Sequence, residues 1–112
     1  MARYPLLATA VPTEGLHQSL LDVLKSCQLE IIHDTADYVM ARERPSGSIP
    51  YPQLVTVEGL IDKTGATRDE IRVEVVIKNE ELPVHSDNHC SRLRDSIHQA
   101  FENTEGWDIV AI

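Results

Sequence analysis

The feature that most constrains the fold of this chain is a two-residue alternation of apolar and polar residues between positions 71 and 78. The apolar positions hold Ile71, Val73, Val75 and Ile77, and the alternate positions include Arg72, Glu74 and Lys78. This period is typical of a β-strand that buries one face and leaves the other accessible. We therefore expect a sheet whose apolar face is covered by another layer of the same domain.

Several other segments have strand character. The expected strands comprise residues 4–11, 29–33, 38–44, 54–62 and 71–77. Turn residues at 34–37, and at 63–67 with Gly65, separate two pairs of these strands, which indicates hairpins and hence an antiparallel sheet. Residues 45–52 contain three prolines and a glycine, so they predict the longest loop.

Two segments have the period of an amphipathic helix. Residues 14–27 carry apolar side chains at three-, four- and seven-residue separations, and Thr13 is placed to cap this helix. A second helix is expected after a cap at Ser86 or Asp87. Its inward stripe consists of Cys90, Leu93, Ile97, Ala100 and Phe101. The apolar segment 107–112 predicts a short final strand or a strap across the core.

These elements predict an α+β fold in a single domain, residues 1–112. The expected order is β-α-β-β-β-β-α, with an antiparallel sheet of about five strands, both helices on one face, and an optional short C-terminal strand. The opposite sheet face then meets either solvent or a partner. This layout is similar to that of TBP-like domains, which the larger START-like ligand carriers elaborate, and a shared layout does not define a function.

The charge of the chain excludes some classes of partner. Its 112 residues include 10 lysines and arginines against 18 aspartates and glutamates, giving a formal charge of -8. An acidic chain is repelled by phosphate backbones and anionic membrane surfaces, so we expect no nucleic-acid partner. No apolar run reaches the ~20 residues that cross a bilayer, so we expect no membrane insertion. The remaining classes of partner are a protein with a basic patch, a cation, and a ligand whose charge is balanced by nearby side chains.

The cysteines and the start of the chain predict a cytoplasmic protein. Cys27 and Cys90 are too few for a disulfide scaffold, and the apolar run at 6–11 is shorter than a signal-peptide core. Reduced thiols are therefore expected.

Several blocks in the second half of the chain resemble a known family. They are residues 53–58, 60–64, 66–67, 77–83 and 88–90. Together these blocks look like a family of small conserved cyanobacterial proteins with no assigned function. The resemblance implies a bacterial cytoplasmic setting, and its blocks contain no catalytic motif.

The segment around the second helix start contains a candidate zinc site. His85, His89 and Cys90 are residue types that bind zinc, and Cys90 could also act as a nucleophile in the first helical turn. However, His89 and Cys90 differ by about a hundred degrees around a helix, so they do not easily meet one ion. A capping segment with a buried thiol on the core stripe is the competing and preferred interpretation.

Asp34 and Asp37 flank the turn of the first hairpin and form a candidate calcium site. Two carboxylates with turn carbonyls supply part of the six to eight oxygens that calcium requires. The chain has no loop that resembles an EF-hand, and aspartate also occurs at turns because it bonds to its own backbone.

Arg42 and Arg44 form a basic island before the sequence Ser46-Gly47-Ser48. Two guanidinium groups beside a small-residue loop can hold a phosphate or carboxylate. Glu43 between them weakens the local field, and solvated arginines at a strand edge are the alternative.

The last candidate is an apolar group that includes two aromatic side chains. Its members are Ile49, Tyr51, Trp107, Ile109, Val110 and Ile112. If this group is exposed, it forms a surface for a partner. If it is buried, it closes the core. Both hold if the final segment pairs across the edge of a homodimer.

The functional hypothesis is a non-enzymatic binding or regulatory module that acts through protein contacts. Arg42, Arg44, Tyr51 and Trp107 are its candidate binding residues. The alternative is a small-ligand or calcium-binding protein with Asp34 and Asp37 at the metal. No nucleophile, base and orienting group stand at a spacing that assigns catalytic roles, so the sequence predicts no enzyme and no cofactor.

Overall fold

The computed structural model describes residues 2–10, 15–45, 47–67, 70–82 and 88–110. The elements in chain order are β1 (Ala2–Ala10), α1 (Leu16–Ser26), β2 (Leu29–Asp34), β3 (Tyr38–Glu43), a 3-10 turn (Tyr51–Gln53), β4 (Thr56–Thr67), β5 (Glu70–Asn79), α2 (His89–Glu102) and β6 (Trp107–Val110). This is the predicted α+β fold, and the optional final strand is present as β6.

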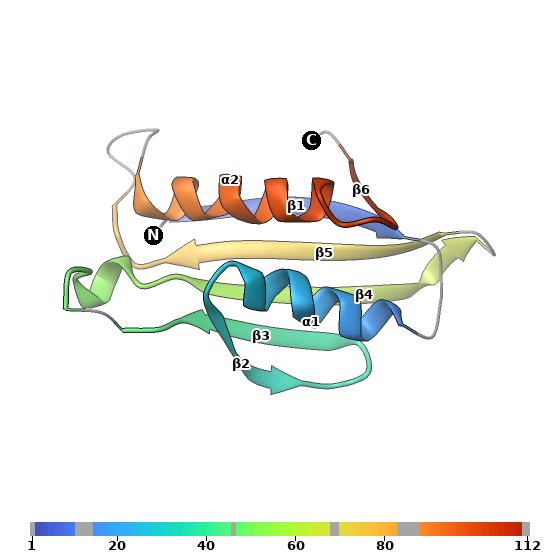
Figure 1. Cartoon of the computed structure of the whole chain (residues 1–112), viewed down its shortest axis with the longest axis horizontal. Coiled ribbons are helices and arrows are strands. Elements are labelled where there is room, and N and C mark those ends of the chain that lie inside the picture. The colour runs from blue at the N-terminus through green and yellow to red at the C-terminus, as the bar shows by residue number, and fades with distance from the viewer. Residues whose placement is uncertain (1, 11–14, 46, 68–69, 83–87, 111–112) are drawn as a thin grey trace.

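The six strands form one antiparallel sheet in the order β2-β3-β4-β5-β1-β6. Both helices lie across one face of this sheet (Figure 1). β1 is inserted between β5 and β6, so the first and last strands of the chain are hydrogen-bonded neighbours. The other sheet face carries no helix.

The two predicted hairpins differ in how closely the structure follows them. The β2–β3 turn is confirmed: the Thr35 N–H donates to the Tyr38 carbonyl at 2.8 Å, and the Thr35 hydroxyl donates to Asp37 at 3.3 Å. β2 carries an irregularity between Ile31 and His33. The second hairpin is confirmed as β4–β5, but its connection lies later than the predicted residues 63–67, because β4 continues to Thr67 with a register shift after Asp62.

The helices have the expected buried stripes but different starts. α1 begins after Gly15 without a side-chain cap bond, and the predicted cap Thr13 lies outside the described residues. Ser86 and Asp87 also lie outside them, and the cap of α2 is Asn88. Its side chain accepts from the Ser91 N–H at 2.9 Å, while the Asn88 N–H donates to the Ser91 hydroxyl at 2.9 Å, which forms a capping box.

The core lies between the helices and the covered sheet face. Its largest fully buried side chains include Phe101, Leu20, Leu24, Ile77 and Ile97. Gly59 in β4 faces Leu20 of α1, and a Cβ there would lie 3.9 Å from the Leu20 side chain, in ordinary contact. Both helices therefore pack on the same alternating set of strand residues that the sequence predicts.

Trp107 belongs to this core and not to a partner surface. It is 6% exposed, its ring packs edge-on against Phe101 at 5.0 Å, and its indole N–H donates to the Ser19 hydroxyl at 2.8 Å. Trp107 is the first residue of β6. Its ring lies on the covered face of the sheet and fills the space beside α2. Of the two alternatives for this residue, core closure is the correct one.

Candidate functional site

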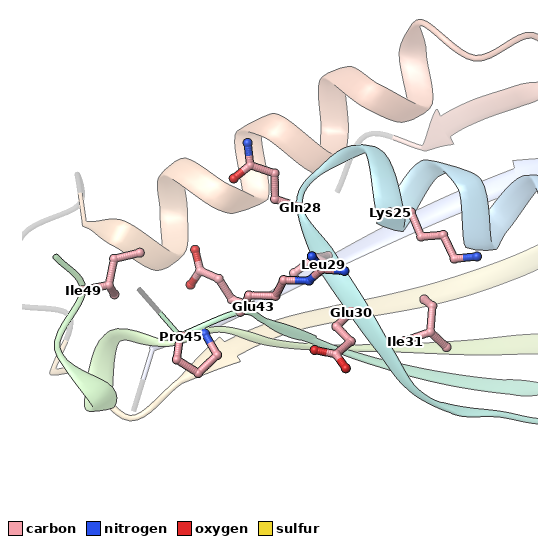
Figure 2. Close-up of a pocket in the computed structure, with 9 residues that line it drawn as sticks. Lys25, Gln28, Leu29, Glu30, Ile31, Glu43, Pro45 and Ile49 are labelled. Atoms are coloured by element: carbon pink, nitrogen blue, oxygen red, sulfur yellow. The ribbon is translucent and has the colours of Figure 1, made fainter. Parts of the chain in front are cut away.

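A groove opens where α1 ends, on the helix side of the sheet. Its first part has a volume of about 770 Å³, within the range of small-molecule sites. The end of α1, the start of β2, the end of β3 and the following loop line it (Figure 2). The lining residues are Lys25, Gln28, Leu29, Glu30, Ile31, Glu43, Arg44, Pro45 and Ile49.

A second hollow of about 610 Å³ continues the groove between the end of α1 and α2. Its lining residues are Ser26, Cys27, Gln28, Glu43, Leu93, Ser96, Gln99, Ala100, Asn103 and Thr104. Gln28 and Glu43 line both hollows, so they mark the junction at which the two parts meet. We use the term groove for the two parts together.

Glu43 is held firmly at this junction. The His89 Nε2 lies 2.8 Å from one carboxylate oxygen and 3.0 Å from the other, and the Val55 N–H donates to the first at 3.2 Å. The side chains of His89 and Glu43 are 21% and 13% exposed. Such partial burial strengthens the interaction relative to a surface pair and gives the carboxylate a defined orientation.

Gln28 reaches the junction with a left-handed backbone, φ 63°. It directly follows Cys27, the C-cap of α1, and its N–H donates to the Lys25 carbonyl at 3.1 Å. Glycine is the usual residue at this position because a Cβ there costs about 1 kcal/mol. The chain turns from α1 into β2 through this residue, with its amide side chain at the groove.

Sequence reasoning did not identify Gln28 or the Glu43–His89 pair. A helix ending near residue 27 and a strand starting at Leu29 leave only Gln28 to reverse the chain, and this spacing is the signal that could have identified it. The Glu43–His89 pair joins segments 46 residues apart, so no local spacing indicates it.

Neither cysteine is placed for nucleophilic chemistry. Cys90 is fully buried, and its thiol lies 3.6 Å from the Ile77 carbonyl. Burial, followed by the charge of Glu81, raises the pKa of the Cys90 thiol to about 11. Burial also raises the pKa of Cys27, and a side-chain hydrogen bond between Cys27 and Ser26 partly offsets that effect. Both thiols therefore stay protonated at neutral pH, where a thiol is a poor nucleophile.

His89 and Cys90 of the candidate zinc site have different partners, and the candidate calcium site at Asp34 and Asp37 stays a prediction. His89 contacts Glu43 while Cys90 faces the core, and His85 lies outside the described residues. Asp34 pairs with His17 of α1 at 2.5 Å. In the described part of the chain, no group of three or more His, Cys, Asp or Glu residues could hold a metal ion.

Arg42 and Arg44 do not form one basic island. β3 ends at Glu43, so the two-residue period that would place both arginines on one face stops before Arg44. Arg44 lines the groove, whereas Arg42 lines a smaller hollow of about 170 Å³ with Tyr51 and Lys78. Tyr51 is 75% exposed, so it remains available to a partner.

The uncovered side of the sheet forms a second candidate surface, which we call the open face. Its side chains alternate with the buried ones along the strands. They are Arg3, Pro5, Leu7 and the buried Thr9 of β1, Glu30 and His33 of β2, Tyr38, Met40 and Arg42 of β3, Thr56, Glu58, Leu60 and Asp62 of β4, Glu70, Arg72, Glu74, Val76 and Lys78 of β5, and Asp108 and Val110 of β6.

Within the described ranges, no helix is long and apolar enough to cross a membrane. No family model, curated protein or solved structure matches the chain. The groove and the open face are therefore the features that bear on function, and the family suggested by the sequence stays a prediction.

Proposed function

We propose that the protein is a non-enzymatic binding module that docks a protein partner on its open face, and that this partner is a second copy of the chain. The single observation that carries the proposal is the composition of the open face. It has an apolar centre and four cations among its charges, on a molecule whose formal charge is -8.

The apolar centre follows from the strand registers. Leu60 of β4 is opposite Tyr38 of β3, and Val76 of β5 is opposite Pro5 of β1. Leu7 and Val110 are also paired. Leu60 is 47% exposed and Val110 is 40% exposed. Burying such side chains against a partner releases roughly 25 cal/mol for each Å² of apolar area.

The charges of the open face favour self-association there over other parts of the surface. It carries four cations (Arg3, Arg42, Arg72, Lys78) and six anions (Glu30, Glu58, Asp62, Glu70, Glu74, Asp108) among the described strand residues. Lys78 and Glu58 form an ion pair at 2.8 Å. Most of the excess negative charge of the molecule therefore lies on other surfaces, and the cations of one open face can pair with anions of the other.

The distribution of charge also selects the symmetry of the dimer. Three of the cations, Arg3, Arg42 and Lys78, form one row across the strands, with Glu30 at its edge. The row at the other end contains Asp62 and Asp108, with Arg72 between them. A two-fold axis across the strands brings each cationic row to the partner's acidic row. An axis along the strands would instead place Arg3 against Arg42 of the second copy, which repels.

The test is the mass of the protein in solution by light scattering and sedimentation over a concentration series. We expect a concentration-dependent dimer for the native chain and a monomer for Leu60→Asp, because the aspartate would be buried in the apolar centre. Leu82→Asp is the matched control, since Leu82 is 75% exposed and follows β5 outside the open face. A native chain that remains monomeric at about millimolar concentration would contradict the proposal.

A charge-reversal pair tests the symmetry separately. Arg3→Glu and Asp108→Arg should each weaken the dimer, and the double variant should restore it, because the axis across the strands brings these two residues near each other. If Arg3→Glu strengthened the dimer, the axis along the strands would be correct and the symmetry argued above would be wrong.

A further inference from the structure

We infer that the groove is a binding site for a free α-amino acid with a large apolar side chain, whose ammonium group meets Glu43 and whose carboxylate meets Arg44. The groove lies on the helix side of the sheet, where Glu43 faces α2, and the open face lies on the other side. The two sites are therefore distinct, and this inference does not depend on a protein partner.

The junction of the groove favours a group that donates hydrogen bonds. The Glu43 carboxylate is oriented by His89 and by the Val55 N–H, and it lines both hollows. The carbonyl end of α1 lies beside it at Ser26, and a helix C-terminus favours positive charge. An ammonium group supplies both the N–H donors and the charge.

The hydroxyl groups of the second hollow add acceptors. The hydroxyls of Ser26, Ser96 and Thr104 donate to the carbonyls of Val23, Arg92 and Ala100 at 2.6, 3.2 and 2.7 Å. Since a hydroxyl has a single proton, each of these groups has only lone pairs left for a ligand. These hydroxyls therefore accept hydrogen bonds from an amine, beside the amides of Gln28, Gln99 and Asn103, which can accept or donate.

The first hollow supplies the complementary features of the amino acid. Arg44 follows Glu43 directly in the chain and lines the same hollow, as does Lys25. Adjacent anionic and cationic side chains match an α-amino acid, in which the ammonium and carboxylate share one carbon atom. The apolar lining consists of Leu29, Ile31, Pro45 and Ile49. These side chains offer an apolar wall to the ligand side chain.

The backbone of Gln28 provides an independent way to test the site. Its left-handed conformation would be more stable with glycine, so the glutamine side chain is not needed to turn the chain. Its amide is at the junction with Glu43 and can bond to either charged group of the ligand. Gln28→Gly should therefore separate binding from folding.

The experiment titrates the full-length protein with L-leucine and L-phenylalanine by calorimetry, and repeats the titration with leucinamide and 4-methylpentanoate. Leucinamide lacks the carboxylate, and 4-methylpentanoate lacks the amine. We expect at least one amino acid to bind and each analogue to bind about tenfold or more weakly, because each loses a charged hydrogen bond.

Variants locate the site. Glu43→Gln and Arg44→Met should each weaken binding about tenfold, and Gln28→Gly should weaken it while the protein unfolds at the same or a higher temperature. Arg92→Met is the control for Arg44→Met, because Arg92 is an exposed arginine of α2 that does not line the groove. Its affinity should equal that of the native chain.

Two results would overturn the inference. One is the absence of heat and of NMR shift changes near Gln28 and Glu43 at about 10 mM amino acid. The other is equal binding of leucine, leucinamide and 4-methylpentanoate, which would show that neither charged group is recognised. A dimer could still form in either case, so this failure is distinguishable from failure of the proposed open-face function.

Discussion

Gln28 combines an unfavourable backbone conformation with a position at the junction of the groove. Its φ of 63° places the Cβ in a crowded region, and glycine removes that cost. Residues that carry such strain often do so for function. At the scale of a single residue, it is the clearest place where folding stability and ligand binding would oppose each other.

Gln28→Gly should raise the free energy of unfolding by roughly 0.5 to 1 kcal/mol, because relief of the left-handed strain outweighs the greater freedom of glycine in the unfolded chain. Urea denaturation followed by circular dichroism measures the change. Gln18→Gly, inside α1, is the control and should lower stability by about 1 kcal/mol. A loss of stability in both variants would contradict the strain argument.

Because of Cys90, the free energy of unfolding depends on pH in the alkaline range. Burial raises the pKa of its thiol from 9.0 to about 11, so between these values the unfolded chain releases a proton that the folded chain keeps. The unfolded state then binds fewer protons, and stability falls as pH rises, by about 2 kcal/mol across the window. Below pH 9 this contribution is fully present.

Comparison of urea midpoints at pH 8 and about pH 10.5 tests this dependence. The native chain should lose more stability over the interval than Cys90→Ala, which lacks the thiol and starts from a lower value because of the cavity. Cys27→Ala should keep most of the native slope, since Cys27 is only partly buried. Equal slopes for the native chain and Cys90→Ala would rule out this role of the thiol.

At the scale of elements, periodicity predicts the strands and helices well because it depends on neighbours along the chain. The alternation from Ile71 to Ile77 and the stripe of α1 both appear as expected. Element ends are harder to predict, since they depend on tertiary pairing. β4 extends past Asp62 to Thr67. β3 ends at Glu43, so Arg44 lies outside the strand and lines the groove.

The start of α2 depends on Asn88. Besides forming the capping box with Ser91, its side chain donates to the Tyr4 hydroxyl of β1 at 2.8 Å. Asn88→Ala should lower the free energy of unfolding by about 1 to 2 kcal/mol, because the Ser91 N–H loses its acceptor and the contact with β1 is lost. Thermal unfolding measures the change.

Asn88→Asp is the conservative control. Aspartate can accept from the Ser91 N–H and from the Tyr4 hydroxyl, so it should restore most of the stability. If Asn88→Asp were as unstable as Asn88→Ala, these hydrogen bonds would not carry the effect.

At the scale of the whole molecule, Trp107 joins three elements: β6, which contains it, α2 through Phe101, and α1 through Ser19. Trp107→Phe should lower stability by about 2 kcal/mol, from lost volume and the lost N–H bond to Ser19. A double-mutant cycle with Ser19→Ala isolates the bond, and we expect a coupling of about 1 kcal/mol. A coupling near zero would show that the bond adds no stability.

The fold class and the arrangement of both helices on one face could be predicted, because amphipathic elements must bury their apolar faces together. The strand order could not, since the pairing of β1 with β5 and β6 joins distant segments. Of the groove, the candidate residues from the sequence included Arg44 and Ile49. The pairing of Glu43 with His89 exists only once β3 and α2 pack together.

The insertion of β1 between β5 and β6 also affects how the protein folds during synthesis. β1 is synthesised before the other described strands, but both of its partners belong to the second half of the sequence. Until they emerge, Leu6 and Ala8 cannot be buried in a paired strand, whereas β2 and β3 can already form their local hairpin. Because both pairings of β1 are long-range, we expect folding to start from the β2–β3 hairpin and to place β1 late.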